Sequence, residues 1–419
     1  MYHGPINRPI CSSSSPSSAS RQDLVKQKRP KSITTMFEWW VKRRRLVLAG
    51  LAGCGAAAYV AYTYYYQNEP DDKNTQQSSD ADDIKKKHVD DDTGIEQRDA
   101  NAHMEHHFNS IQEIARTTTI PSLMTQLFQS IIEYDGVEDM VDRLKTAAQQ
   151  KHGSLTLKDK LDLWNGVLER VVARSVATVW LVPMVHAQVR VQLNVLGRNL
   201  YVQSMLSESE SHRGVSRLSA ASQEGFLSIA EYIGSEGYRN IMDYATEVSR
   251  KALEGVQSAA DQVTVVEWNT IVSQALREFE NTCAKNKWWS GAMLPPSEYI
   301  RKHVLKLDRP DNAALMSGYQ NGALDIDAIE AMYKETVHIV QSDACFECIR
   351  TSAMVLSSMM SKHVIEHFGG KGERFPLVKI VPVVANHISS LLNQQGEFYS
   401  AVDQEISRLG AMVYSAGVS

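Results

Sequence analysis

The chain has 419 residues, of which 43% are hydrophobic and 22% are charged, and its formal net charge is -5 at pH 7. These values are typical of a soluble globular protein and exclude the strongly basic composition of many nucleic-acid-binding proteins. The chain has five cysteines, which are too few and too scattered to cross-link a protein of this length, so the cysteine usage favours a reducing compartment.

The chain opens with a polar extension followed by a basic aromatic segment. Residues 1–35 include the run CSSSSPSSAS and have no hydrophobic periodicity, so we predict that they are disordered. Met36, directly after this extension, is an alternative start. Residues 36–45 form the second segment, in which Trp39 and Trp40 precede a basic run. The basic residues of that run are Lys42, Arg43, Arg44 and Arg45.

Residues 46–66 contain no charged side chain. As a helix they would extend about 32 Å at about 1.5 Å per residue, which matches the hydrocarbon core of a bilayer at about 30 Å. A cleavable signal peptide is disfavoured because too long a leader precedes the apolar run. Lipid attachment at Cys54 is disfavoured because the apolar sequence continues to Tyr66. We therefore predict a single transmembrane helix at residues 46–66.

The residues alone leave the orientation of this span open. More Lys and Arg residues lie within about 20 residues before the span than after it, and the positive-inside rule would place the N-terminus in the cytosol. The cysteine usage of the large C-terminal part favours the opposite orientation, with that part in the reducing cytosol.

After the span, the sequence divides into a charged linker and a helical domain. Residues 67–102 have many charges and few apolar residues, so they cannot bury enough surface to offset chain entropy, and we predict a flexible linker. From 103 to 419, apolar residues recur at three- and four-residue spacing without strand alternation. We therefore predict an all-α fold, in which the N-terminal transmembrane helix is followed by an elongated, twisted helical bundle at residues 103–419. Helices are predicted near 104–133, 158–206, 222–253, 259–286, 296–307, 324–341, 343–367, 376–393 and 398–416.

The longest predicted helix has no break signal between Asp159 and Leu206 except Pro183. A proline inside a helix removes one backbone hydrogen bond and usually bends the axis. We expect a kinked helix that forms the spine of the bundle.

Two clusters could in principle support metal or redox chemistry. Cys345 and Cys348 have a two-residue spacing, but no matching second pair follows, so a buried pair of small apolar side chains is favoured. His103 and His107 lie one turn apart next to the predicted linker, which favours a solvated helix face. The sequence has no Gly-rich phosphate loop, nucleophile elbow or zinc-protease motif. We predict no enzymatic activity, metal, cofactor or small-molecule substrate; a membrane-tethered metal or redox protein is the alternative.

The segment at 158–202 places a tryptophan one turn after a lysine. On a helix, Trp164 is either packed in the core or protrudes as an anchor for a partner, and periodicity alone favours the core. One stripe of this helix contains Lys160, Trp164, Val167 and Val171, and Leu161, Leu168 and Val172 lie beside it.

Several stretches occur in a characteristic order. KLDLW, an Arg-Ser-x-x-x-Val helix and RVQLNVLGRNLYV lie within 158–202, and FPLVKIVPVVANHISSLL and EISRLGAMVYSAG follow near the C-terminus. With the aromatic pair, the basic run and the single span before them, they resemble the peroxin-3 family. The resemblance extends from about residue 36 to the end of the chain and is firm at 158–202 and 375–392.

This resemblance implies a docking receptor of peroxisome biogenesis. Its helical bundle would lie in the cytosol, tethered to the peroxisomal membrane by a span whose short leading segment faces the peroxisome interior, which is the orientation that the cysteines favour. The partner would be the N-terminal amphipathic helix of peroxin-19, the cytosolic chaperone that carries newly made peroxisomal membrane proteins. A structural organelle tether, or an inheritance or pexophagy adaptor, is the alternative function. Direct targeting and transit through the endoplasmic reticulum both stay open.

By position, the resemblance implies that Trp164 is the principal anchor of a groove for peroxin-19, which replaces the preference for a core role. Lys160, one turn before it, and Val167, three residues after it, are implied as neighbours in that groove. Leu161, in the same block, is also predicted to contact the partner.

The resemblance extends the groove to other parts of the chain. Leu200 is implied as part of the facing wall, and Lys379, the lysine of FPLVKIVP, as a basic residue at the rim. The leucine that often precedes the KLDLW block in the family is either Leu155 or Leu157.

The basic run and the span together are predicted to form the targeting signal. Replacing Arg43, Arg44 and Arg45 by glutamate removes the positive charge before the span, so fluorescence microscopy is expected to show the protein away from peroxisomes. The same charge reversal at residues 85–87, on the other side of the span, is the control. Normal peroxisomal targeting of the first variant would contradict the prediction.

Overall fold

Helix α5 (Leu157–Glu208), 52 residues long, forms the centre of the fold. Every residue from Val171 to Arg198 is buried, on all sides of the helix. Apolar side chains occur all round this part of α5 rather than on one face, which is the pattern of a helix surrounded by others. The predicted helix at 158–206 is therefore confirmed, and Pro183 lies inside it.

The computed structural model describes residues 89–149, 155–208, 218–305, 324–369, 372–392 and 397–416. They belong to one of the two compact units of the chain, Leu51–Ser419. Before α5 lie α2 (Val89–Ile114), the π-helix η1 (Ala115–Thr119), α3 (Ile120–Asp135) and α4 (Val137–Gln149). After it come α6 (Ala220–Ser228), the π-helix η3 (Ile233–Gly237), α7 (Tyr238–Ala252), α8 (Val265–Asn286), α9 (Ser290–Met293), α10 (Ser297–Tyr299) and the π-helix η4 (Ile300–Val304). The last helices are α12 (Ile326–Val340), α13 (Asp343–Phe368), the 3-10 turn η5 (Leu377–Lys379), α14 (Ile380–Leu392) and α15 (Glu397–Ser415).

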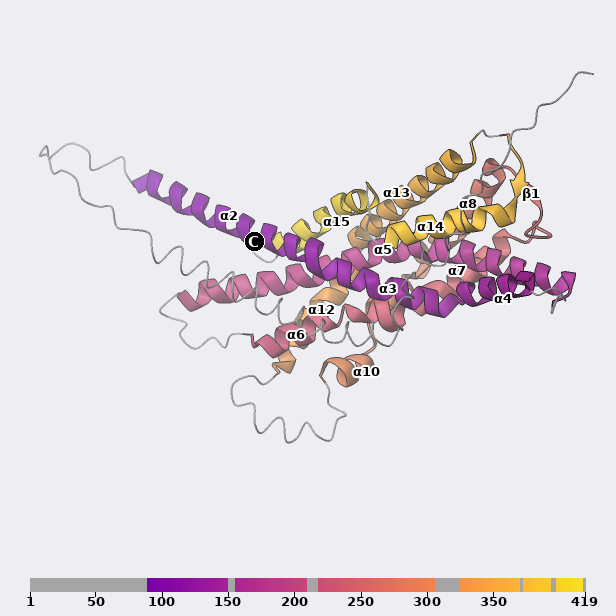
Figure 1. The fold of residues 1–419 in the computed structure, drawn as a ribbon. Helices are drawn as coiled ribbons and strands as arrows, with labels where there is room; N and C mark the ends of the chain where they lie inside the picture. Colours follow the sequence, from indigo (N-terminus) through magenta and orange to yellow (C-terminus); the bar gives the residue numbers. More distant parts are fainter. Residues whose placement is uncertain are drawn as a thin grey trace, which may run out of the picture. The chain divides into compact units, whose positions relative to one another are not determined.

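Most of these elements pack directly on α5. Figure 1 shows α5 between the C-terminal helices α13 to α15 and the helices α6 and α12. Helices α7, α3 and α4 cover further parts of its surface. The described residues are thus almost entirely helical, which confirms the predicted all-α class, and α5 is the predicted spine.

Three arginines on the buried part of α5 are paired with different neighbours. Arg174 binds Asp135 at the end of α3, with a distance of 2.6 Å from Nη2 to Oδ1, and it also contacts Glu138 of α4. Arg190 donates to Gln112 of α2 and Asp403 of α15. Arg198 pairs with Glu335 of α12 and donates to the carbonyl oxygen of Val413, on α15, at 2.9 Å. Buried charges need such partners, so these pairs restrict which helices can lie beside each part of α5.

The helices before α5 differ from the prediction at two places. The flexible linker predicted at 67–102 is wrong for its last part because α2 begins at Val89. The sequence VDDDTG places negative charge at the helix start, where the helix dipole favours it. Helix α4 was not predicted. It begins after Gly136, whose left-handed backbone, with φ of 61°, ends α3 and turns the chain.

The helix predicted at 222–253 is two helices, α6 and α7, joined by a turn and the π-helix η3. Gly234 and Gly237 lie in η3, and Gly237 allows the backbone of α9 to approach closely. The predicted helix at 259–286 begins only at Val265, after a capping box of Thr264 and Glu267. Before it, the strand β1 (Gln262–Val263) pairs antiparallel with β2 (Phe375–Pro376). Segments of two residues are too short for a strand pattern to appear in the sequence.

The C-terminal predictions are confirmed to within a few residues, except that β2 and η5 occupy the first part of the helix predicted at 376–393. The helix predicted at 296–307 corresponds to α10 and η4, which together end at Val304. The four-residue helix α9 was not predicted.

No helix within the described ranges combines the length and the apolar composition that crossing a bilayer requires. The span predicted at 46–66, the disordered extension at 1–35 and the basic segment at 36–45 lie outside the described residues.

The close approach at Gly237 gives a test of the packing between η3 and α9. A Cβ atom at this position would lie 2.0 Å from the carbonyl oxygen of Ala292, so Gly237→Ala forces backbone to move. We expect this variant to lose about 1–3 kcal/mol of unfolding free energy, measured by urea denaturation of the full-length chain. Gly291→Ala is the matched control, because a Cβ atom there meets nothing within 4 Å. Equal stability of Gly237→Ala and the wild type would refute this account of the contact.

Candidate functional site

The start of α5 is fixed by a capping box. The Oγ1 atom of Thr156 accepts from the backbone N–H of Asp159 at 3.2 Å, and the carboxylate of Asp159 accepts from the backbone N–H of Thr156 at 3.0 Å. These reciprocal bonds satisfy donors that a helix start leaves free. The hydrogen bonds from Thr156 also lower the pKa of the Asp159 carboxyl. The first turns of α5 are therefore ordered although they extend beyond the buried part of the helix.

An apolar stripe runs from this exposed end into the core. Leu157, Leu161, Trp164 and Leu168 follow each other at spacings of four, three and four residues, which places them on one side of α5. Leu157 is 77% exposed, Leu161 and Trp164 are half-buried, and Leu168 is buried. The indole of Trp164 packs against the hydrophobic core. The core thus continues onto the surface at the start of α5, and we name Leu157, Leu161 and Trp164 the α5 stripe.

Other elements cover the remaining sides of this helix end. Gly166, opposite the stripe, faces Met140 of α4, whose sulfur would lie 3.4 Å from a Cβ atom at that glycine. Glu169 forms an ion pair with Arg250 at the end of α7, with a nitrogen–oxygen distance of 3.0 Å. Helices α4 and α7 therefore hold α5 from behind and from one flank.

A hydrogen-bonded chain of segments joins the start of α5 to Lys379. The Oδ1 atom of Asn165 accepts from the backbone N–H of Ala259 at 2.8 Å. The carbonyl oxygen of Ala259 accepts from the N–H of Val378 at 2.9 Å, and that of Asp261 accepts from the N–H of Leu377 at 3.0 Å. Lys379 is the next residue and is exposed. Segments that lie more than 200 positions apart in the sequence are thereby brought to the same end of α5.

The structure brings together four of the six predicted groove residues. Lys160, Leu161 and Trp164 share the exposed first turns of α5, and Lys379 lies on the adjoining segment. Lys160, like Trp164, is half-buried.

Two predicted groove residues are not placed at this surface. Val167 is fully buried in the core, so it supports the stripe from inside rather than lining a groove. Leu200 is on the same helix as Trp164 and follows it by 36 residues, which corresponds to about 54 Å along the axis. The prediction that Leu200 forms the facing wall of the same groove is therefore wrong. The predicted targeting residues Lys42, Arg43, Arg44 and Arg45 lie outside the described residues.

Sequence reasoning missed Asn165 and did not decide between Leu155 and Leu157. Leu157 belongs to the α5 stripe, whereas Leu155 precedes the helix and is half-buried. The spacing of Leu157, Leu161 and Trp164 was a readable signal for the stripe. Asn165 gave no signal, because its acceptor role depends on a loop about 94 residues away.

The side chains of Cys345, His103 and His107 pack against other parts of the protein. Cys345 is buried, and burial raises the pKa of its thiol to about 12, so it is protonated at neutral pH. His107 is half-buried, its Nδ1 atom lies 2.7 Å from the hydroxyl of Tyr414, and its ring packs near Tyr201. The prediction that His103 and His107 form a solvated face is therefore wrong, since the ring of His103 also lies near Tyr201. No group of His, Cys, Asp and Glu suited to a metal ion occurs in the part of the chain that the structure describes.

Comparison with known proteins matches residues 66–416 to the family model described as Peroxin-3. The chain belongs to the Peroxin-3 family. It is similar to peroxisome biogenesis protein 3-2 of Arabidopsis thaliana, with 29% identity over 353 residues, covering 83% of this chain and 88% of the relative. It is also similar to peroxisome biogenesis protein 3-1 of the same plant, with 28% identity over 187 residues, covering 44% of this chain and 51% of the relative.

Membership of the Peroxin-3 family confirms the resemblance that the sequence motifs indicated. It assigns the chain a role in peroxisome biogenesis and points to a peroxisomal location. The family is one of biogenesis factors, and membership also points to interactions with peroxisomal membrane proteins.

The bond from Ala259 to Asn165 allows a test of how the start of α5 is joined to its neighbours. Asn165→Ala removes the acceptor of a buried N–H, so we expect a loss of about 1–2 kcal/mol in unfolding free energy and faster amide exchange at Ala259 and Val378. Hydrogen exchange followed by mass spectrometry measures the second effect. Asn165→Asp, which keeps the acceptor oxygen, is the matched control. Unchanged exchange in Asn165→Ala would show that the bond does not hold these segments together.

Proposed function

We propose that this chain is a docking receptor that binds the N-terminal amphipathic helix of peroxin-19 at the α5 stripe, so that peroxin-19 can deliver peroxisomal membrane proteins. The single observation that carries this proposal is that Trp164 packs against the core and is still only half-buried, next to half-buried Leu161 and exposed Leu157 on the same side of α5. An apolar surface of this kind, on an ordered helix end, fits a ligand helix that presents apolar residues at helical spacing.

The chemistry of Trp164 supports its role as the anchor. Its indole is half-buried against the core, which restricts the ring before a partner arrives and lowers the entropic cost of binding. Tryptophan is the residue type most often found at the energetic centre of protein interfaces. Leu157, with 77% of its surface exposed, would gain burial from the same partner.

The charges around the stripe favour a ligand helix with acidic residues on its flanks. Lys160 lies one turn before Trp164, and exposed Lys379 lies on the segment joined to this end of α5. Exposed charges of this type contribute more to the rate of association and to orientation than to affinity. The stripe would therefore supply most of the binding free energy, and the lysines would select the partner.

The proposed receptor is anchored by the predicted span at 46–66, with Lys42, Arg43, Arg44 and Arg45 as part of the targeting signal and the helical domain in the cytosol. The cysteines among the described residues, Cys283, Cys345 and Cys348, carry free thiols, which suits a reducing compartment.

Truncation of Trp164 is the direct test. We expect Trp164→Ala to weaken binding of peroxin-19 by at least about 2 kcal/mol, or about 30-fold in Kd, because the anchor is lost. Calorimetry with the full-length chain in detergent micelles and peroxin-19 from the same organism measures the affinity, and circular dichroism checks that helical content is unchanged.

The control is Val266→Ala, which shortens another exposed apolar side chain, 53% exposed, at the start of α8. Equal affinity of Trp164→Ala and wild type would move the binding site away from the α5 stripe. Absence of binding by the folded wild-type chain would overturn the receptor proposal itself.

A further inference from the structure

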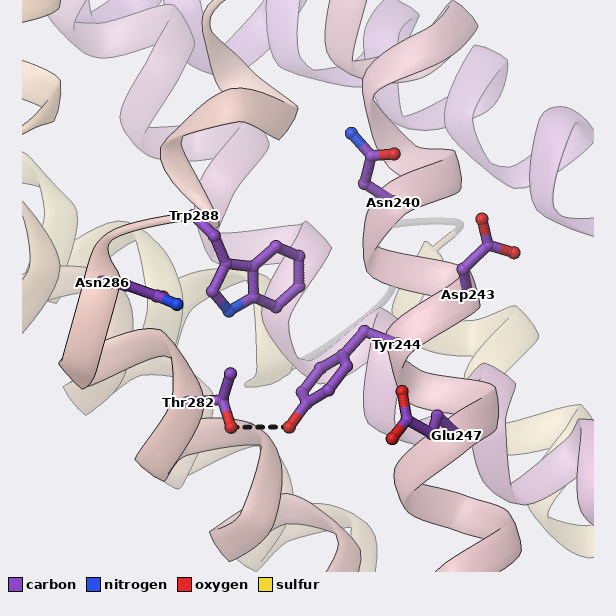
Figure 2. Close-up of a pocket in the computed structure, with 7 residues that line it drawn as sticks. All are labelled: Asn240, Asp243, Tyr244, Glu247, Thr282, Asn286 and Trp288. Carbon is purple, nitrogen blue, oxygen red and sulfur yellow. Dashed lines mark hydrogen bonds between the residues drawn. The ribbon is translucent and has the colours of Figure 1, made fainter.

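A second surface with binding chemistry lies between α7 and α8, and it shares no residue with the α5 stripe. It is an open pocket with a volume of about 440 Å³, which is within the range of about 300–1,000 Å³ common for ligand sites. Figure 2 shows Trp288 and Tyr244 between the two helices, with Asn286 on one side and Asp243 and Glu247 on the other. The lining residues are Asn240, Asp243, Tyr244, Glu247, Thr282, Asn286 and Trp288.

The aromatic part of this pocket is held rigidly. The ring of Trp288 lies 5.1 Å from that of Tyr244 and 5.7 Å from that of Phe279, both in edge-on geometry. The hydroxyl of Tyr244 and Oγ1 of Thr282 are hydrogen-bonded at 2.6 Å, which joins α7 to α8 (Figure 2). Because the rings are fixed by their neighbours, a ligand meets a surface that does not need to reorganise.

Lys287 has a left-handed backbone that positions Trp288, and its own ammonium group points away from the pocket. Lys287 has a φ of 52° and ends α8, so the chain turns back and brings the next residue, Trp288, against α7. The ammonium group of Lys287 points elsewhere, since it binds Asp343 at 2.8 Å and the carbonyl oxygen of Gln341 at 2.9 Å.

The pocket lining carries negative charge and no positive charge. Asp243 and Glu247 lie one turn apart on the exposed face of α7, and no Lys or Arg is among the lining residues. Asp243 accepts a hydrogen bond from the hydroxyl of Tyr134, and this bond raises the pKa of that tyrosine to about 12. Glu247 pairs with Lys251 on its own helix at 2.9 Å. Both members of that pair are half-exposed, so a stronger ligand can replace the lysine at little cost.

We propose that this pocket binds an arginine side chain on a basic segment of a partner protein. A guanidinium group stacks on aromatic rings and presents five donors in a plane, so it suits a pocket that combines the rings of Trp288 and Tyr244 with the carboxylate of Glu247, while Asp243 adds negative charge to the lining. The amide oxygens of Asn240 and Asn286 provide further acceptors at the rim. Lysine fits less well because its compact ammonium group is strongly hydrated and does not stack.

The site is open rather than enclosed, which suits a side chain that enters from a peptide backbone outside the protein. This proposal does not depend on the binding of peroxin-19 at the α5 stripe, because the pocket and the stripe have no residue in common. A partner bound here could occupy the receptor at the same time as a ligand of the stripe.

The test uses the full-length chain in detergent micelles, labelled with 5-fluorotryptophan, and N-acetyl-arginine amide as the probe. Fluorine NMR follows each tryptophan, and the resonance that is missing in Trp288→Phe identifies Trp288. We expect N-acetyl-arginine amide to shift this resonance in a saturable way, and the neutral isostere N-acetyl-citrulline amide to leave it unchanged.

Charge removal gives the second arm of the test. The double variant Asp243→Asn and Glu247→Gln is expected to bind the arginine probe about fivefold more weakly, because it removes the negative charge of both carboxylates. Both side chains are exposed, so these replacements leave the fold intact. Glu254→Gln, an exposed carboxylate beyond the end of α7, is the matched control and should retain wild-type affinity. The proposal would be overturned by an equal shift with the citrulline probe or by an equal affinity for N-acetyl-lysine amide. Unchanged affinity for the arginine probe in the double variant would also overturn it.

Discussion

The complete burial of the middle of α5 is the constraint on which the other packing depends. A helix surrounded on all sides can carry charge only where a partner reaches it, and Arg174, Arg190 and Arg198 each meet a different set of partners. Those partners come from helices before and after α5 in the chain. The arginines therefore do more than fill space, because they specify which neighbour belongs at which level of the central helix.

Much of the fold was readable from the sequence because long helices carry a strong periodic signal. Helix α5 could be predicted almost to the residue, since nothing between its ends except Pro183 opposes a helix. The errors fall where tertiary contacts decide. Gly237, where the backbone of α9 approaches closely, lies in the π-helix between α6 and α7, and the pairing of 262–263 with 375–376 replaces helix with extended backbone. Neither contact leaves a local pattern in the sequence.

The candidate site was predictable in part, and the reason differs between residues. Lys160, Leu161 and Trp164 lie within two turns of one helix, so correct prediction of that helix was enough to group them. The same helix also separates Leu200 from Trp164 by 36 of its 52 residues, a distance that follows from helix geometry and that motif matching does not take into account. The pocket at Trp288 could not be foreseen, because it depends on the packing of α7 against α8 and on the turn at Lys287 that brings Trp288 between them.

The position of α5 in the chain has a consequence for biosynthesis. The helix is complete at Glu208, whereas two of the helices that cover it, α13 and α15, begin about 135 and 190 residues later. At translation rates of about 5–20 residues per second, the ribosome needs roughly ten seconds or more to make them. During that interval α5 lacks the part of its cover that α13 and α15 provide in the finished fold. Its middle part, from Val171 to Arg198, is buried on all sides only once these C-terminal helices have been made, so the core is completed at the end of synthesis.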